Sequence, residues 1–349
     1  MDASPRPFRA LVTLASLVLV VAACSGGAAT ASPPTTSPPA ASAPPSVAPS
    51  AAPSVAASPS AAAFPISLTD DEGTAVEIAA EPVRIVSLTP ATTEILFAIG
   101  AGERVVATTD FDDYPPEAVA LPDVASFTAV DVEKIVGLEA DLVLAGGNNF
   151  NDPAAIAQLR SLGTPVVVTY AADIEGVLRD IELVGAAVGE ADAARDLAVS
   201  MQARFDQVGA ATAGLERPRV FYELDATTEI YTAADDSFIE QMIELAGGDP
   251  ITTGSPTSFS ISLERLIDAD PQLILLGDAA YGVTPEIVAA RPGWAVMTAV
   301  RDGRITAVDD IVITRPGPRL VEGLRQLAAA IHPDVVLPSA VPASAGPQP

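Results

Sequence analysis

The sequence predicts an α/β protein built from two Rossmann-like lobes that a single long helix bridges. Short apolar runs alternate with helical patterns between residues 84 and 188 and again beyond Pro218. This alternation is typical of parallel βαβ units whose sheet is covered on both faces. Between the two series, residues 190–212 carry apolar side chains three or four positions apart and no Gly or Pro before Gly209, which predicts a long amphipathic helix.

The first series predicts the elements of the N-terminal lobe. Two alternating runs, 66–69 and 75–78, flank a turn that contains Gly73 and predict a β-hairpin. Apolar runs then predict strands over residues 84–88, 104–107, 141–145 and 165–169. Helices are expected over residues 92–99, 132–138, 152–162 and 174–188.

The second series predicts a C-terminal lobe of related plan. Strands are expected over residues 219–224 and 272–276, helices over 238–245 and 263–268, and segments 285–290, 304–308 and 317–331 complete the series. Residues 131–145 and 262–276 also echo each other, because each holds a Glu near the start of a short helix, a turn and a buried strand. The echo fits two related lobes, although two ordinary helix–strand units could match by coincidence.

These patterns divide the folded chain into three parts. The N-terminal lobe is expected over residues 64–190, the interlobe helix over 191–213 and the C-terminal lobe over 214–337. Two Rossmann-like lobes would place loops at the carboxyl ends of their strands, which is where open α/β sheets bind ligands.

The N-terminal end has the pattern of a secreted lipoprotein. Arg6 and Arg9 precede an uncharged apolar run over residues 10–22. The run is short for a membrane span, so residues 1–23 are expected to form a cleaved signal peptide rather than a permanent anchor. The Val-Ala-Ala-Cys sequence that ends at Cys24 resembles the lipobox of bacterial lipoproteins. That resemblance implies a lipid on Cys24 that holds the mature protein at the extracytoplasmic face of the cell membrane.

Two further segments are expected to stay outside the folded lobes. Residues 24–63 consist almost entirely of Ala, Ser, Pro and Thr after the cysteine, and residues 338–349 have a similar composition. Such segments bury too little apolar surface to offset the entropy of ordering, so we expect a disordered tether and a disordered tail. A glycosylated stalk is the alternative for the tether.

Composition excludes several classes of function. The chain has 45 Asp and Glu against 18 Lys and Arg, a net charge of −27 that opposes binding to nucleic acid. A single Cys and a single His leave no intrachain disulfide and no zinc cluster of His and Cys ligands. No nucleophile is paired with a base, so we expect neither an enzyme nor a resident metal or cofactor.

Four stretches in order carry a resemblance to a known family. They are Arg84-Ile-Val-Ser-Leu-Thr-Pro-Ala-Thr-Thr-Glu, Asp113-Tyr-Pro-Pro-Glu-Ala, Phe238-Ile-Glu-Gln-Met-Ile-Glu-Leu-Ala-Gly-Gly, and Arg291-Pro-Gly-Trp-Ala followed by Arg315-Pro-Gly-Pro-Arg. The chain resembles the substrate-binding proteins of bacterial ABC importers for vitamin B12, haem or iron–siderophore complexes. The resemblance implies a monomer that binds a small metal complex between its lobes and delivers it to a permease and its ATPase. Cobalt or iron would belong to the transported ligand.

The resemblance also implies which residues contact the ligand. Phe111 and Phe127 fall where B12-binding members carry aromatic contacts, and Arg315 falls where they carry an arginine. Loops expected at the carboxyl ends of strands add Asn149, Tyr231 and Phe259 to this set. Other interpretations stay open, because Phe150 and Phe259 could plug the core, and Arg315 and Arg319 could cap the last helix or pair with acids. Trp294 is expected to pack in the second lobe.

Two glutamates are candidates for docking onto the permease. Glu133 and Glu264 occupy the same place in the internal echo, one in each lobe. In the family, equivalent glutamates pair with arginines of the permease, although acids at helix starts are also favoured by the helix dipole alone.

From the resemblance to B12-binding members, a B12-like corrinoid is the first expectation for the ligand. A ferric siderophore or haem is the second. A surface lipoprotein that senses or adheres without a transport role is the alternative function.

Overall fold

The computed structural model describes residues 64–127 and 129–338. The expected signal peptide, the lipid on Cys24 and the tether lie outside the described residues, as does the expected tail beyond Pro338.

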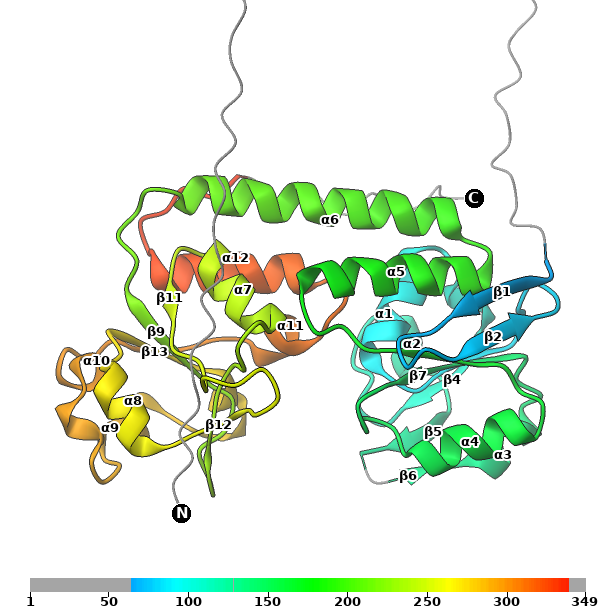
Figure 1. Cartoon of the computed structure of the whole chain (residues 1–349), viewed down its shortest axis with the longest axis horizontal. Coiled ribbons are helices and arrows are strands. Elements are labelled where there is room, and N and C mark those ends of the chain that lie inside the picture. Colours follow the sequence, from blue (N-terminus) through cyan, green and yellow to red (C-terminus); the bar gives the residue numbers. More distant parts are fainter. Residues whose placement is uncertain (1–63, 128, 339–349) are drawn as a thin grey trace, which may run out of the picture. The chain divides into compact units, whose positions relative to one another are not determined.

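The N-terminal lobe contains a six-stranded sheet that is parallel except at one edge (Figure 1). Its strands run in the order β6-β5-β4-β3-β7-β8, and β6 pairs antiparallel with β5. The strands are β3 (Ile85–Ser87), β4 (Val105–Thr109), β5 (Asp123–Ser126), β6 (Ala129–Val130), β7 (Leu142–Gly146) and β8 (Val166–Thr169). The helices are α1 (Pro90–Ala98), α2 (Pro116–Val119), α3 (Val132–Gly137), α4 (Pro153–Ser161) and α5 (Ile174–Val188).

The hairpin expected before this sheet is present. Strands β1 (Ile66–Thr69) and β2 (Ala75–Ile78) pair antiparallel. Strand β5 and its partner β6 were not predicted, because Asp123 and the small side chains of Ala125 and Ser126 interrupt the apolar pattern. Every strand and helix that was predicted for this lobe is confirmed within a few residues of its expected bounds.

The C-terminal lobe has a smaller, wholly parallel sheet in the order β11-β9-β13-β14. Its strands are β9 (Arg219–Glu223), β11 (Asp249–Pro250), β13 (Leu273–Leu276) and β14 (Ile305–Ala307), and β10 (Ile230–Tyr231) pairs separately with β12 (Ser260–Ile261). The helical segments are α7 (Phe238–Leu245), α8 (Leu263–Ala269), η2 (Gly277–Tyr281), α9 (Pro285–Ala289), α10 (Thr298–Arg301), α11 (Asp310–Thr314) and α12 (Leu320–Ile331).

Two details of this lobe bear on the predictions. The last helix was expected from residue 317 but begins at Leu320, after a separate short helix α11. Arg315 between them is extended, with φ −84° and ψ 116°, because the residue before a proline is driven out of the helical region. Trp294 packs edge-on against Phe221 in the core, as predicted.

The long helix α6 (Ala191–Thr212) joins the lobes (Figure 1). Its buried side chains include Met201, Phe205 and Val208, at the spacing that predicted the helix. It packs against α5 of the first lobe and against α12 and α7 of the second. One apolar cluster therefore runs from the first sheet through Phe205 into α12. A shared apolar core restrains relative motion of the lobes more than a polar contact would.

Candidate functional site

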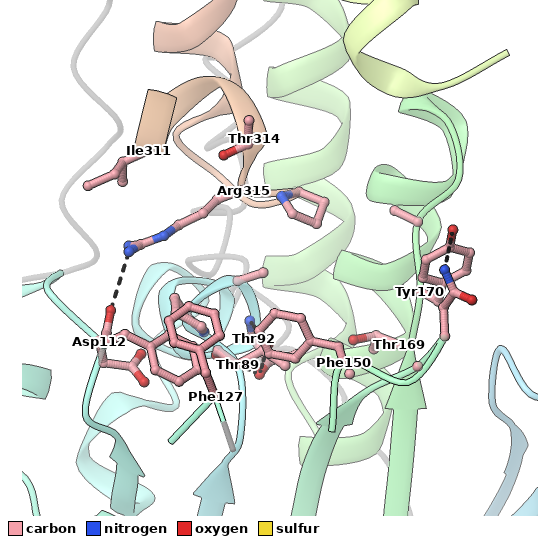
Figure 2. Close-up of a pocket in the computed structure, with 18 of the residues that line it drawn as sticks. Thr89, Thr92, Asp112, Phe127, Phe150, Thr169, Tyr170, Ile311, Thr314 and Arg315 are labelled. Atoms are coloured by element: carbon pink, nitrogen blue, oxygen red, sulfur yellow. Dashed lines mark hydrogen bonds between the residues drawn. The ribbon is translucent and has the colours of Figure 1, made fainter. Parts of the chain in front are cut away.

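A cavity of about 730 Å³ opens between the lobes at the carboxyl ends of the first sheet (Figure 2). Four loops of the N-terminal lobe line it, following β3, β4, β7 and β8, and Phe127 contributes from the β5–β6 turn. The C-terminal lobe contributes Tyr281 from η2, together with residues of α11 and the segment after it. The size lies within the range of cofactor and ligand sites.

Three phenylalanines form an aromatic wall on the N-terminal side of the cavity. The rings of Phe111 and Phe127 stack with centroids 4.3 Å apart and 18° between their planes. Phe150 meets both edge-on, at 6.0 Å from Phe111 and 6.4 Å from Phe127. Phe127 is 76% exposed and Phe150 is 46% exposed, so neither ring is a core plug. The wall offers apolar faces to a flat ligand.

Strand β7 ends on Gly146, and the lack of a side chain there lets the following loop bring Phe150 to this wall. A Cβ atom at Gly146 would lie 2.8 Å from Cγ2 of Thr89 and 2.9 Å from Cδ1 of Phe150, closer than real side chains approach. Asn148 and Asn149 then turn the chain in the left-handed region, with φ 53° and 61°. Asparagine tolerates that conformation better than most residues.

Tyr170 borders the cavity directly after β8. Its hydroxyl accepts a hydrogen bond from Nδ2 of Asn148 at 3.1 Å (Figure 2). Its backbone N–H donates to Asp71 at 2.7 Å. Asp180 of α5 also lines the cavity. Burial raises the pKa of Asp180 to about 9, and a hydrogen bond to Asp71 and the charge of Asp71 add to the shift. Asp180 is therefore an uncharged carboxylic acid at neutral pH.

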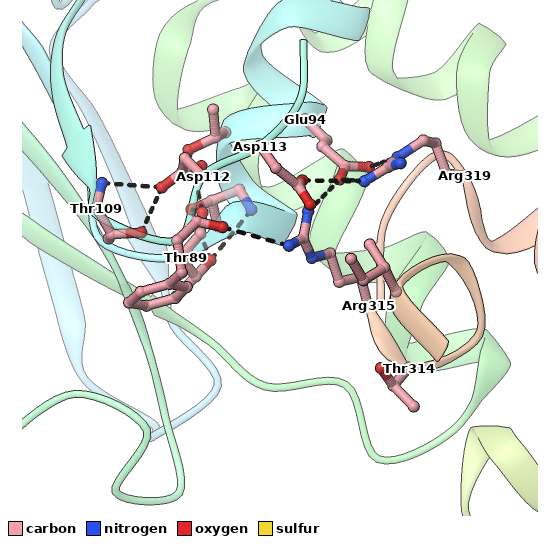
Figure 3. A network of polar contacts seen from close by, with 12 residues as sticks. Thr89, Glu94, Thr109, Asp112, Asp113, Thr314, Arg315 and Arg319 are labelled. Atoms are coloured by element: carbon pink, nitrogen blue, oxygen red, sulfur yellow. Dashed lines mark hydrogen bonds and ion pairs between the residues drawn. The ribbon is translucent and has the colours of Figure 1, made fainter. Parts of the chain in front are cut away.

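An interlobe ion cluster consists of Glu94, Asp113, Arg315 and Arg319, and it borders the cavity through Asp113 and Arg315 (Figure 3). Arg319 binds Glu94 through Nη2 at 2.6 Å and through Nε at 3.0 Å. Arg315 pairs with Asp113, contacts Glu94 at 3.2 Å and donates to the carbonyl of Phe111 at 3.3 Å. The acid-pairing interpretation of both arginines is confirmed. Both arginines come from the C-terminal lobe and both acids from the N-terminal lobe.

Further carboxylates surround the cavity. Asp112 accepts hydrogen bonds from the backbone N–H and the hydroxyl of Thr109, at 2.8 and 2.5 Å. Asp310 accepts one from the hydroxyl of Tyr222 at 2.8 Å. Burial raises the pKa of both acids above the usual range. Among the described residues that line the cavity, the acids are Asp110, Asp112, Asp113, Asp180 and Asp310, and Arg315 is the single base.

The structure brings four of the six expected ligand residues to this cavity. Phe111, Phe127, Asn149 and Arg315 line it. Tyr231 and Phe259 do not belong to its lining, because they lie at the antiparallel β10–β12 pair, where the Thr232 N–H donates to the Phe259 carbonyl at 2.8 Å. Their expected ligand role stays untested.

Sequence reasoning missed two aromatic residues of the lining, Tyr170 and Tyr281. Tyr170 directly follows a predicted strand, so the rule that selected the other loops could have found it. Tyr281 ends a short 3₁₀ helix that had no sequence signal.

The expected docking residues lie on matching elements of the two lobes. Glu133 is in the first turn of α3 and Glu264 in the first turn of α8, and both are exposed. Both helices lie on the side of their lobe away from α6 (Figure 1). Neither carboxylate has a hydrogen bond or ion pair with another residue in the described part of the chain.

Residues 64–127 and 129–338 lack two kinds of feature. No helix there is long and apolar enough to cross a bilayer. No group of three or more His, Cys, Asp or Glu residues there is arranged to hold a metal ion.

Comparison with known proteins identifies the family. The family model described as "Periplasmic binding protein" matches residues 85–312. The chain belongs to this family. Members bind substrates for transport and are not enzymes, which agrees with the expectation from the sequence.

Individual relatives indicate which kind of transport system this periplasmic binding protein serves. An uncharacterized ABC transporter substrate-binding lipoprotein, YvrC of Bacillus subtilis, is 34% identical over 78% of this chain and 87% of its own. A cobalamin-binding protein of Halobacterium salinarum is 31% identical over 78% of this chain and 75% of its own. The solved haem-binding protein RhuT of Roseiflexus is 29% identical over 72% of this chain and 98% of its own, with a TM-score of 0.63. The chain is thus the extracytoplasmic substrate-binding protein of an ABC importer of the B12, haem and iron type.

Proposed function

We propose that this protein captures a corrinoid of the vitamin B12 type between its lobes and delivers it to its permease. The observation that carries the proposal is the composition of the cavity wall. Three clustered phenylalanine rings line it, and no His, Met or Cys belongs to the described lining. The aromatic wall suits the flat face of a macrocycle.

The described lining lacks His, Met and Cys, three of the four side chains that hold haem iron in proteins, and this favours a corrinoid over haem. Proteins hold haem iron through an axial His, Cys, Met or Tyr. A complete corrinoid brings its own nitrogen base to cobalt and needs no ligand from the protein. The 31% identity to a protein named cobalamin-binding supports the same choice.

A haem receptor is the second candidate, because Tyr170 and Tyr281 line the cavity and a phenolate can ligate ferric iron. Incubating the purified protein with cyanocobalamin, haemin or a ferric siderophore, followed by desalting and a visible spectrum, separates the candidates. We expect retention of cobalamin. Retention of haemin that Tyr170→Phe or Tyr281→Phe abolishes would instead identify a haem receptor. Retention of none of the three would contradict the corrinoid proposal and indicate another substrate for this importer.

We further propose that Glu133 and Glu264 each form a salt bridge with the permease when the loaded monomer docks. Their exposure, their lack of partners in the described part of the chain and their matching positions in the two lobes support this. The double variant Glu133→Ala plus Glu264→Ala should lose uptake while ligand binding stays intact. Matched substitutions at Glu139 and Asp268 are the control, because both acids lie outside the first turns of α3 and α8. Unchanged uptake in the docking variant would exclude the role.

The lipid anchor on Cys24 belongs to the same proposal, on the strength of the lipobox-like sequence and of the similarity to a protein named as a lipoprotein. The wild type should partition into the detergent phase of a cloud-point extraction. Cys24→Ala should lose the lipid and remain attached, if at all, only through an uncleaved leader. Metabolic labelling with a fatty acid distinguishes attachment through a lipid from attachment through an uncleaved leader. Equal labelling of the wild type and Cys24→Ala would contradict a lipid on Cys24.

A further inference from the structure

The charges around the cavity carry an inference about the edge of the ligand. Glu94 and Asp113 are balanced by Arg315 and Arg319 in the interlobe ion cluster. Asp180 is uncharged at neutral pH, because its pKa is about 9. Asp110, Asp112 and Asp310 add further carboxyl oxygens, and the described lining holds no basic side chain besides Arg315 to balance them. The cavity is therefore rich in hydrogen-bond acceptors and negative in net charge.

The single basic side chain of the described lining is already occupied. The guanidinium of Arg315 contacts Asp113, Glu94 and the Phe111 carbonyl. A ligand carboxylate at Arg315 would share one guanidinium with Asp113 and Glu94, so it would add a third negative charge to a cation that two acids already neutralise. An uncharged amide avoids this added charge, because its NH₂ group can donate to Asp113 while the ion pair stays in place.

Resting on the proposed function, we propose that the cleft selects metal complexes with a neutral or cationic, hydrogen-bond-donating edge and rejects carboxylate-edged ones. Asp113 is the specificity-determining residue. Its side chain is 45% exposed at the cavity, whereas that of Glu94 is 1% exposed and held by two hydrogen bonds from Arg319. Asp113 can meet a ligand, and Glu94 cannot.

Two forms of one ligand test the inference. Cyanocobalamin and the monocarboxylic acid obtained by hydrolysing one of its peripheral amides differ by a single charge. Titration calorimetry at pH 7.5 and low salt should give a Kd about tenfold or more lower for the amide form. In Asp113→Asn, the ratio of the two Kd values should fall to about threefold or less. Added salt should lower the same ratio for the wild type, because salt screens the charge of Asp113.

Glu117→Gln is the matched control, because Glu117 is an exposed acid in the first turn of α2, four residues after Asp113, and lies outside the cavity lining. It removes the same charge and should leave the ratio unchanged. Equal affinities for both forms, or an unchanged ratio in Asp113→Asn, would overturn the inference while leaving a cobalamin receptor intact.

If neither form binds, the proposed function is wrong, but this result does not decide the inference about the charge of the ligand edge. The inference is then tested with a cationic ferric trihydroxamate and an anionic ferric tricatecholate. Retention of the cationic complex alone supports it. Retention of the anionic complex, or of neither, overturns it.

Discussion

Arg319 at the start of α12 holds the buried carboxylate of Glu94 in α1 through two hydrogen bonds, of 2.6 and 3.0 Å, that cross from one lobe to the other. Arg319 also stacks over the ring of Tyr114, 4.5 Å from its centre. The apolar core around α6 also connects the two lobes. This ion pair and that core together hold the lobes in place on either side of the cleft.

Arg319→Met should therefore destabilise the fold. Removing one partner of a buried pair leaves the other charge poorly compensated, which costs about 3 kcal/mol. The control is Arg195→Met, whose exposed ion pair with Asp192 on α6 should contribute less than about 1 kcal/mol. Chemical denaturation measures both, and equal losses in the two variants would contradict a structural role for Arg319.

Gly146→Ala should disturb the aromatic wall. The new methyl group would meet Thr89 and Phe150 at less than 3 Å, and such overpacking costs about 1–3 kcal/mol. Gly137→Ala is the matched control, because a methyl group added there would have no neighbouring atom within 4 Å and its φ is not positive. We expect the first variant to lose both stability and ligand affinity and the second to lose neither. Wild-type affinity in Gly146→Ala would show that Phe150 does not need this approach.

Asp278 should make stability depend on pH. Burial, followed by the negative charge of the neighbouring Glu223, raises its pKa to about 7 from an ordinary value of 3.8. The folded state therefore holds a proton that the unfolded state releases, so this contribution is present below about pH 4 and is lost as the pH rises to about 7.

Asp278→Asn should remove that part of the pH dependence and should be more stable than the wild type at pH 8. Asp302→Asn, at an exposed position, should not. Thermal unfolding between pH 4 and 8 gives the comparison. Asp180 contributes to the slope in both proteins, so the slope should become smaller in Asp278→Asn, and an unchanged slope would assign the effect to other groups.

The regular parts of this fold could be predicted from sequence because periodic burial determines them. The spacing of Met201, Phe205 and Val208 located α6 nearly to the residue. The resemblance to B12-binding receptors singled out Phe111 and Arg315, and both line the cavity. Local pattern failed where the structure depends on distant partners: Arg315 and Glu94 are 221 positions apart, and nothing near either residue indicates the other.

Titration of the protein with cyanocobalamin, compared with the double variant Phe111→Ala plus Phe127→Ala, tests the corrinoid proposal most directly. Each lost ring contact is worth about 1 kcal/mol, so the double variant should bind about 30-fold more weakly. Phe259 is exposed and lies outside the cavity lining, so Phe259→Ala should bind like the wild type, a result that would also remove Phe259 from the expected ligand residues. Tight binding by the wild type with this pattern is the expected result. No binding by the wild type, or equal binding by the double variant, would contradict capture of a corrinoid at this wall.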